Sequence, residues 1–280
     1  MKMKKLKLIS VLGNIKIFSW LPRKLAQLYR EGSVVRIRRG RAKGMLWKRY
    51  KRYVNGYWLG IYEFEIQERI AQELKSGDIF FDIGANAGFF SLIAGKIAGK
   101  SGRVYSFEPL PMNFSAIQEQ FKLNNLNQCK PFNLALGNKN GNSLFILPKT
   151  LKGKPNTFTA RLAHINTSNE ETNEKIEVQT VTLDSFIKKQ KTVPHIIKID
   201  IEGAEVEMLE GAKNLLSSQN APKLIIETHS HDIAKKVEKI LRKAKYQFFD
   251  IKGNIKSDCL FDRHILAYPS QIKIKPVIFK

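Results

Sequence analysis

Hydrophobic and polar positions follow a repeating strand and helix order through most of the chain. Short apolar runs, typical of buried strands, are followed by segments whose apolar residues recur at helical spacing. Such alternation indicates βαβ units around a parallel sheet. The sequence predicts strands at 79–83, 103–107, 130–133, 178–182, 196–199 and 224–227, helices at 89–98, 112–123, 183–190, 204–217 and 232–244, and a closing antiparallel pair at 246–251 and 264–268.

Two regions depart from this order. Within 137–178 the pattern predicts one strand at 142–147, and residues 149–175 are rich in Asn, Thr, Lys and Glu, which indicates an insertion loop. Such loops often carry substrate contacts. Before residue 79 we expect two short basic amphipathic helices around 8–19 and 25–29, a hairpin with strands at 34–39 and 45–48, and a helix at 61–74.

The charge of the chain is concentrated at its beginning. The chain has 48 basic and 25 acidic residues, a net charge of +23, and residues 1–60 contain 17 Lys and Arg against the single acid Glu31. We therefore divide the chain into a basic extension, 1–56, and a main domain, 57–280. The extension must lie near negative charge, so nucleic acid, anionic lipid and an acidic substrate are all candidates.

The same region contains no run near the ~20 apolar residues that a membrane span needs. Cys129 and Cys259 are too few for a disulfide framework or a cysteine-based zinc site. A reducing, cytoplasmic setting is the simplest expectation. Peripheral contact with an anionic membrane through residues 1–56 is compatible with it.

The first candidate site lies where the strand at 79–83 turns into a helix. Asp82 leaves the strand end toward the crevice, Gly84 permits a sharp turn, and Gly88 permits the helix to pass close to a ligand. Asn86 stands where a dinucleotide loop has its second glycine, and no phosphate-loop lysine follows. The spacing of Asp82, Gly84 and Gly88 instead resembles the first motif of S-adenosylmethionine-dependent methyltransferases.

Two further strand ends fit a nucleoside ligand. Glu108 ends the next strand, 20 residues beyond Gly88. At that position a carboxylate can accept hydrogen bonds from both ribose hydroxyls. Asn133 and Ala135 close the third strand, where methyltransferases of this kind usually surround the adenine.

The fourth and fifth strands end in the densest groups of titratable residues. Asp200, Glu202 and Glu205 lie within six residues, and such a cluster is unfavourable unless Lys198, a metal or a ligand sulfonium supplies positive charge. An acidic first helical turn is the alternative reading, above all for Glu205. After the fifth strand come Glu227, His229 and His231; His229 is a candidate general base, with a metal ligand or a solvated loop as alternatives. His164, His195 and His264 have no comparable neighbours in the sequence.

Together these segments resemble the FkbM family of methyltransferases, from about residue 57 to about residue 266. The resemblance implies a Rossmann-like, seven-stranded, mostly parallel sheet with an antiparallel last strand, S-adenosylmethionine as methyl donor, and a hydroxyl oxygen of a sugar or secondary metabolite as acceptor. It rests on seven segments in order: Gly60-Ile61-Tyr62-Glu63, Asp82-Ile83-Gly84-Ala85-Asn86, Phe107-Glu108-Pro109, Ala135-Leu136-Gly137, Thr182-Leu183-Asp184, the segment from Lys198 to Glu205, and Glu227.

The expected reaction is methyl transfer to an alcohol oxygen, in which the protein mainly aligns donor and acceptor. An alcohol must lose its proton as the new bond forms, and Asp200, Glu202 and His229 are the candidate proton acceptors. A divalent metal held by Asp200 and Glu227 would serve the same end by lowering the pKa of the hydroxyl. We prefer the mechanism without metal.

Two other functions fit parts of the sequence. A ribose methyltransferase acting on RNA would use the basic extension to bind phosphates. The segment from Asp200 to Gly203 is neither the Pro-Pro-aromatic loop of enzymes that methylate base amines nor a cysteine nucleophile site, but this does not exclude ribose methylation. A binding protein that keeps the fold without turnover is the third possibility, although no motif is degraded. A glycan or small-molecule acceptor is the preferred partner.

Overall fold

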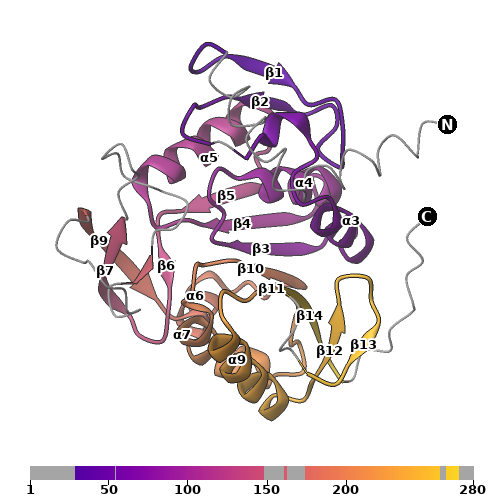
Figure 1. Cartoon of the computed structure of the whole chain (residues 1–280), viewed down its shortest axis with the longest axis vertical. Helices are drawn as coiled ribbons and strands as arrows, with labels where there is room; N and C mark the ends of the chain where they lie inside the picture. Colours follow the sequence, from indigo (N-terminus) through magenta and orange to yellow (C-terminus); the bar gives the residue numbers. More distant parts are fainter. Residues whose placement is uncertain (1–28, 54, 148–160, 163–173, 259–262, 271–280) are drawn as a thin grey trace.

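An eight-stranded sheet forms the centre of the fold (Figure 1). The computed structural model describes residues 29–53, 55–147, 161–162, 174–258 and 263–270. From one edge to the other, the strands are β13 (Ile255–Lys256), β12 (Tyr246–Asp250), β14 (His264–Pro269), β11 (Lys223–Glu227), β10 (Ile196–Ile199), β3 (Ile79–Ile83), β4 (Arg103–Phe107) and β5 (Cys129–Phe132).

The strand directions confirm the predicted Rossmann-like fold. Strands β11, β10, β3, β4 and β5 run parallel to one another. Strand β14 lies between β11 and β12 and is antiparallel to both, so the last long strand is the reversed one. The predicted pairing of the two closing segments is correct. The short edge strand β13, which pairs with β12, is an addition to the seven expected strands.

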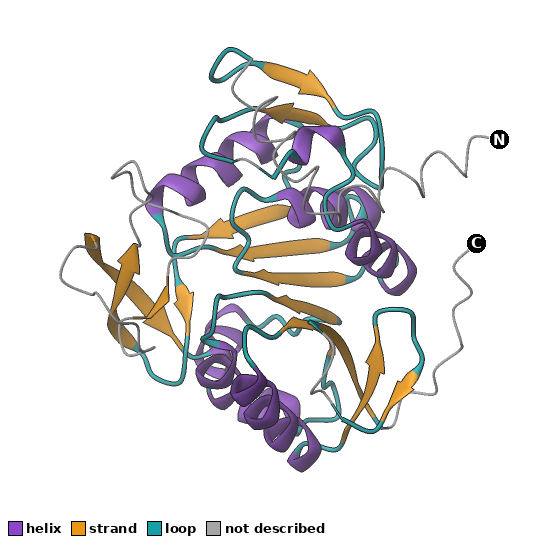
Figure 2. Ribbon diagram, viewed as in Figure 1, coloured by secondary structure: helices purple, strands orange, loops and turns teal. Residues whose placement is uncertain are grey.

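Helices cover both faces of this sheet (Figure 2). Because side chains alternate along a strand, Phe80 packs into the core on one face and Phe81 into the core on the other. One face carries α3 (Phe64–Glu73), α4 (Phe89–Ala98) and α5 (Pro111–Leu123); the other carries α6 (Leu183–Gln190), α7 (Glu205–Glu210), α8 (Lys213–Leu216) and α9 (His231–Lys243).

One predicted helix is wrong in its length. The expected single helix over 204–217 is divided into α7 and α8 at Gly211 and Ala212. A Cβ atom at Gly211 would lie 2.0 Å from the backbone oxygen of Gly137. The chain therefore comes so close to the strand-end loop at Gly137 that a regular helix with an ordinary side chain has no room there.

A second sheet corrects the expected insertion loop. Its order is β6 (Ala135–Leu136), β9 (Glu174–Val181), β7 (Gly141–Leu147) and β8 (Arg161–Leu162). Residues 161–162 and 174–175 were expected in the loop but belong to strands, and β9 begins four residues before the predicted 178. Seven residue pairs join β7 and β9. Phe145 of β7 and Val178 of β9 are buried in a small apolar cluster with Ala135 of β6, so backbone pairing and this cluster together form the sheet.

Residues 29–53, which belong to the segment expected to form a basic extension, share a hydrophobic core with the central sheet and its helices. The predicted hairpin is confirmed in shorter form, with β1 (Val34–Arg36) antiparallel to β2 (Leu46–Lys48). Trp47 is buried against Tyr57, in the short 3-10 helix η1 (Tyr57–Leu59), and against Phe89 of α4. The two expected amphipathic helices around 8–19 and 25–29 lie outside the described residues, apart from Tyr29.

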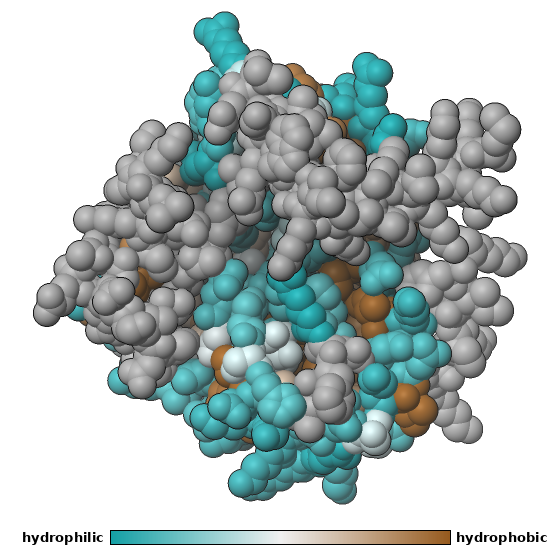
Figure 3. All heavy atoms as spheres, in the orientation of Figure 1, coloured by the Kyte–Doolittle hydropathy of each residue, from teal (hydrophilic) through white to brown (hydrophobic). Residues whose placement is uncertain are grey.

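The surface of the described residues is mainly hydrophilic in the view of Figure 3, with small separate hydrophobic patches. Among the described residues, no helix combines the length and apolar character that a bilayer crossing requires. Several basic side chains of the extension are engaged within the protein. Arg41 pairs with Glu68, Lys48 pairs with Glu119, and the Arg49 guanidinium lies 4.1 Å from the ring centre of Tyr29.

Replacing Trp47 by Ala should destabilise the protein strongly. Trp47 is 1% exposed, and its removal leaves a large cavity between the hairpin and α4. We expect the free energy of unfolding to fall by about 3–5 kcal/mol in urea titrations. Val34→Ala, at a 47% exposed hairpin position, is the matched control and should change it by less than about 0.5 kcal/mol. Equal effects of the two substitutions would show that the hairpin does not pack as described.

Candidate functional site

The site forms where four neighbouring parallel strands end. Strands β4, β3, β10 and β11 are adjacent in that order, so their carboxyl ends meet at one edge of the sheet. The backbone amide of Asp200, just after β10, donates to the carbonyl of Ile83 at 3.1 Å. The loops after β3 and β10 are therefore in direct contact, and this edge is where open α/β sheets bind their ligands.

The turn after β3 depends on glycine. Gly84 has φ 78°, and a Cβ atom there would lie 1.9 Å from the backbone oxygen of Asp200. The amides of Gly84 and Ala85 both donate to the carbonyl of Phe107 at 3.0 Å. Gly88, with φ 82°, precedes α4, and a Cβ atom there would lie 3.3 Å from the side chain of Ile117. The predicted sharp turn at Gly84 is thus present.

Glu108 connects the loops after β3 and β4. Its Oε2 accepts the amide of Asn86 at 2.8 Å, and its Oε1 accepts the amide of Leu110 at 3.0 Å and the side chain of Asn113 at 3.3 Å. Burial raises the pKa of Glu108 to about 7, although these hydrogen bonds act in the opposite direction. A carboxylate has about four acceptor positions. Three are used, so one remains for a ligand hydroxyl.

Asp82 is not in the crevice, where the sequence placed it. It is completely buried, and Ser91 donates to its Oδ2 at 2.6 Å. Its Oδ1 has no hydrogen-bond partner among the described residues and lies 3.8 Å from the Lys198 ammonium. Burial raises the pKa of Asp82. Asp82 therefore acts beneath the site, where it helps to hold Lys198.

Three other residues were predicted to bind the methyl donor: Asn133, Ala135 and Asn86. The Asn133 amide donates to the carbonyls of Glu108 and Pro109 at 2.9 and 2.8 Å and so braces that loop. Ala135 is buried in β6 and pairs with Thr180 of β9. Asn86 adopts φ 50°, and its side-chain oxygen is buried without a partner among the described residues. Of these three, Asn86 has an unused polar atom beside the turn.

A cluster of carboxylates surrounds His229 after β11. The Nδ1 atom of His229 lies 2.6 Å from Oε1 of Glu205, which is completely buried. Its Nε2 atom lies 3.5 Å from Glu202, 3.5 Å from Glu227 and 3.7 Å from Asp200. Burial alone would lower the pKa of His229, but the hydrogen bond to Glu205 and the nearby carboxylates raise it to about 9.

Glu202 and Lys198 complete the cluster on the β10 side. Glu202 adopts φ 52°, and burial raises its pKa to about 7, with Asp200 and Glu227 adding to the effect and His229 opposing it. The Lys198 ammonium lies 3.1 Å from Asp200 and 4.9 Å from the ring centre of Phe90. Lys198 thus supplies one of the cations that the sequence required among these carboxylates.

The sequence interpretation missed two residues of this site. His264 was expected to have no neighbours of note, but its Nε2 lies 3.0 Å from Glu227, because β14 pairs with β11 and sets Glu227 opposite His264. Glu63 lies at the start of α3 with φ 40°. Its buried Oε2 has no hydrogen-bond partner among the described residues and lies 4.0 Å from His264. The Gly60–Glu63 motif was the available signal for Glu63.

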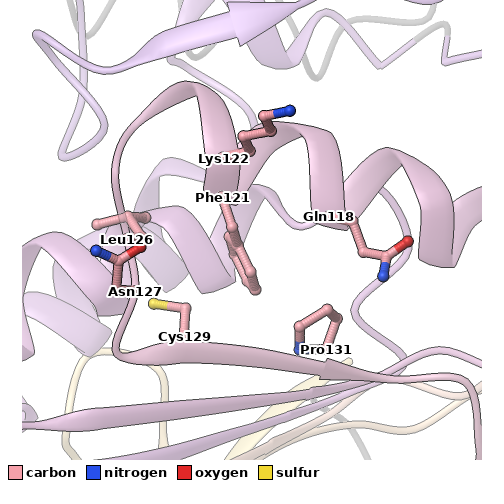
Figure 4. Close-up of a pocket in the computed structure, with 7 residues that line it drawn as sticks. All are labelled: Gln118, Phe121, Lys122, Leu126, Asn127, Cys129 and Pro131. Carbon is pink, nitrogen blue, oxygen red and sulfur yellow. The ribbon is translucent and has the colours of Figure 1, made fainter.

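A separate hollow lies between α5 and β5 (Figure 4). Its volume is about 290 Å³, and it is lined by Gln118, Phe121, Lys122, Leu126, Asn127, Cys129 and Pro131. Cys129 is the first residue of β5, so the hollow begins at the opposite end of the strand from the carboxyl edge. The Lys122 side chain points away from it in Figure 4. The hollow is therefore not part of the site.

A comparison with protein families decides the class of the protein. Residues 82–248 match the model of the methyltransferase FkbM domain. The chain belongs to this family. It is a methyltransferase that depends on S-adenosylmethionine, as the motif resemblance implied. The match begins at Asp82 and includes all the site residues described above except Glu63 and His264.

Two relatives and one solved structure are similar to this FkbM methyltransferase. A hexuronic acid methyltransferase, AglP, of Haloferax volcanii is 26% identical over 206 residues, which cover 72% of this chain and 77% of that protein. "Methyltransferase 1" of Beauveria bassiana is 24% identical over 142 residues, covering 46% of this chain and 56% of the relative. The structure of an FkbM methyltransferase from Methylobacillus flagellatus has a TM-score of 0.42 and 18% identity, covering 68% of this chain and 43% of the other.

Gly84→Ala should disrupt the turn between the two loops. The added Cβ would overlap the Asp200 carbonyl at 1.9 Å and would also place alanine at φ 78°. We expect a loss of about 3 kcal/mol in the free energy of unfolding, measured by urea titration. Gly44→Ala is the matched control, since Gly44 has φ 91° with no atom within 4 Å, and should cost about 1 kcal/mol. A Gly84 variant no less stable than this control would contradict the close approach.

Proposed function

We propose that this FkbM methyltransferase transfers the methyl group to a hydroxyl oxygen of a sugar in a glycan or glycolipid. The observation that carries the proposal is the contact between two loops. The Gly84 turn lies against the backbone of Asp200, and Asp200 borders the cluster of Glu202 and His229. The proposed donor site and a group of proton acceptors therefore meet at the same sheet edge.

The residues at the ends of β3 and β4 fit the donor. When bound, S-adenosylmethionine supplies an electrophilic methyl group on a sulfonium. We assign the one free acceptor position of Glu108 to a ribose hydroxyl of this ligand. We assign the unpartnered side-chain oxygen of Asn86 to an N–H or O–H group of the same ligand, which would donate a hydrogen bond to it. Gly84 and Gly88 shape the turn. Three further residues lie behind this turn and act as positioning residues. Asp82 and Ala135 are buried, and Asn133 is hydrogen-bonded to the backbone.

The residues at the ends of β10 and β11 fit the acceptor. The hydroxyl must lose its proton. Of the three candidates, Asp200 and Glu202 can take it in this proposal, because the raised pKa of His229, about 9, keeps that ring protonated at neutral pH. Glu202 is the most accessible member, with 35% of its side chain exposed against 21% for Asp200 and 19% for His229. We therefore assign the proton to Glu202. Asp200 and His229 hold the surrounding charge in place.

The charge of the site favours a hydroxyl over a carboxylate acceptor. The name of the Haloferax relative refers to hexuronic acid, a sugar that offers both groups. Besides Glu108 on the donor side, six carboxyl groups line or underlie the site among the described residues: Glu63, Asp82, Asp200, Glu202, Glu205 and Glu227. They would repel an acceptor carboxylate at short range. A neutral hydroxyl approaches without this repulsion.

The basic extension supports an acceptor on an anionic carrier. Arg36, Arg38, Arg39, Lys43 and Lys51 are exposed. Each basic residue near an anionic membrane contributes roughly 1 kcal/mol of attraction. In this proposal the acceptor sugar is linked to lipid, and RNA is the competing carrier because it presents the same kind of charge.

Donor binding should strengthen as the pH rises from 6 to 8. Burial raises the pKa of Glu108 to about 7, so the carboxylate that accepts the ribose hydroxyl is mostly protonated at pH 6 and mostly ionised at pH 8. We expect about a tenfold gain in affinity over this range, measured by calorimetry. Glu108→Gln is the matched control and should bind weakly with little pH dependence. An identical pH profile in both proteins would place the ribose elsewhere.

The acceptor assignment is tested by the stability of the product. Protein incubated with labelled S-adenosylmethionine and a lipid-linked, hexuronic acid-containing glycan should give a methyl ether that resists mild alkali. Glu202→Gln should reduce turnover by about 10² to 10⁴-fold while donor binding stays unchanged. A methyl group released by mild alkali would identify an ester and overturn the hydroxyl assignment. Labelling of RNA in place of the glycan would favour the ribose methyltransferase.

A further inference from the structure

The geometry points to a divalent-cation site formed by Asp200, Glu227 and His229. One donor atom from each residue lies within 4.8 Å of the others. Glu227 is buried, and Asp200 and His229 are partly buried, so the group is not a solvated surface cluster. The inference deepens the proposed function and rests on it only for the role of the ion, since binding of a cation requires neither methyl donor nor acceptor.

The distances around His229 Nε2 match ligands better than hydrogen bonds. Nε2 lies 3.7 Å from Oδ1 of Asp200 and 3.5 Å from Oε1 of Glu227. Direct hydrogen bonds to nitrogen are typically about 2.7–3.2 Å long. Two ligands on a tetrahedral ion, with bonds of about 2.0–2.2 Å, are roughly 3.4 Å apart. The two distances from Nε2 are thus close to the spacing of neighbouring ligands, and the two carboxylate oxygens lie within 4.8 Å of each other.

Glu205 provides the second observation. Its Oε1 lies 2.6 Å from Nδ1 of His229 and accepts the amide of Gly203 at 3.2 Å. A carboxylate on the distal ring nitrogen is the usual partner of a metal-binding histidine, because it fixes the ring and directs the other nitrogen to the ion. The second oxygen of Glu205 is buried and has no hydrogen-bond partner among the described residues. The cluster therefore holds negative charge that its own side chains do not fully compensate.

The other contacts of the two carboxylates leave room for the ion. Lys198 binds Oδ2 of Asp200 and His264 binds Oε2 of Glu227, so in each case the opposite oxygen faces His229. Arg263 also binds Oε1 of Glu227, but 69% of its side chain is exposed. A divalent ion would displace this guanidinium into solvent, and the proton on Nε2 of His229 would be released to water as the nitrogen binds the ion. The ion would bring two positive charges in place of the single positive charge of Arg263.

The ligand set indicates the class of ion and its role. One imidazole with two carboxylates suits Mn²⁺ or Zn²⁺, whereas an all-oxygen set would favour Ca²⁺. A sugar hydroxyl on the ion would have a lower pKa. Its O–H bond would break with the electron pair left on oxygen, and the proton would pass to Glu202, which lies 3.5 Å from His229 Nε2. The ion and Glu202 then share the task of activating the acceptor.

Metal titration of the full chain tests the site directly. The protein is freed of metal with a chelator, and Mn²⁺ and Zn²⁺ are added separately in calorimetry, without methyl donor or acceptor. We expect one ion per chain. His229→Gln, Asp200→Asn and Glu227→Gln should each weaken binding at least tenfold, and Glu205→Gln should weaken it by about 10- to 100-fold through the orientation of His229.

His195→Gln is the matched control for the histidine substitution. His195 lies near Asp78, and its side chain is 56% exposed, so its loss should leave metal binding unchanged. Circular dichroism and thermal unfolding identify any variant that fails to fold. The folded variants and the number of ions bound by the wild type then decide whether these residues bind a metal ion. Absence of binding by the wild type at millimolar metal, or wild-type affinity in all three folded ligand variants, would overturn the site. Metal binding without methyl transfer would instead count against the proposed function alone.

Discussion

The ion pairs of Lys198 are the interaction on which the site depends. Lys198 is buried within β10 and lies between Asp82 of β3, at 3.8 Å, and Asp200, at 3.1 Å. Because Lys198 pairs directly with Asp82 in the sheet register, the two strands must stay aligned for both contacts to exist. Removal of the ammonium would leave two carboxylates without compensation in a water-poor environment, which is strongly destabilising. The close packing of Gly84 on Asp200 requires the same alignment.

A chain of buried polar groups extends this constraint to the neighbouring strand. Ser106 of β4 donates to Ser91 of α4, and Ser91 donates to Asp82. Glu108, two residues after Ser106, receives the amide of Asn86 from the turn. The hydrogen bonds of such a network restrain the groups that they join, here Ser106, Ser91 and Oδ2 of Asp82. The donor and acceptor sides of the site are thus held in register before any ligand binds, as alignment of two reactants requires.

The central fold could be predicted from the sequence because its signals are local. Strands β3, β4, β10 and β11 are each a short apolar run followed by a turn and a helix, so these elements were found within a few residues. The break between α7 and α8 at Gly211 could not be predicted. The φ angle of Gly211 is −77°, which any residue can adopt, and the atom that leaves no room for a side chain there is the carbonyl oxygen of Gly137, far away in the sequence. The sheet that contains β8 and β9 was predicted only in part: strands at 142–147 and 178–182 were expected, whereas β8 is very short and β9 begins with the polar residues Glu174 and Lys175, which give no local apolar signal.

The candidate site was only partly visible for the same reason. Asp200, Glu202 and Glu227 could be found because each follows a predicted strand directly. His264 faces Glu227 only through the antiparallel register of β14 with β11. The burial of Asp82 was also hidden, since Ser91 and Lys198, the groups that make it tolerable, come from other elements. Sequence order identifies strand ends, whereas the compensation of charge depends on which strands become neighbours.

The negative charge of the site is better explained by ligand binding than by stability. Lys198 compensates Asp82 and Asp200, and the His229 imidazolium is shared among four carboxylates. Buried ion pairs seldom stabilise a fold more than apolar side chains of the same volume. A cluster with spare carboxylates therefore costs folding free energy that a purely structural role would not require. The cost is offset when a cation enters, whether as the sulfonium of the donor or as a metal ion beside the acceptor.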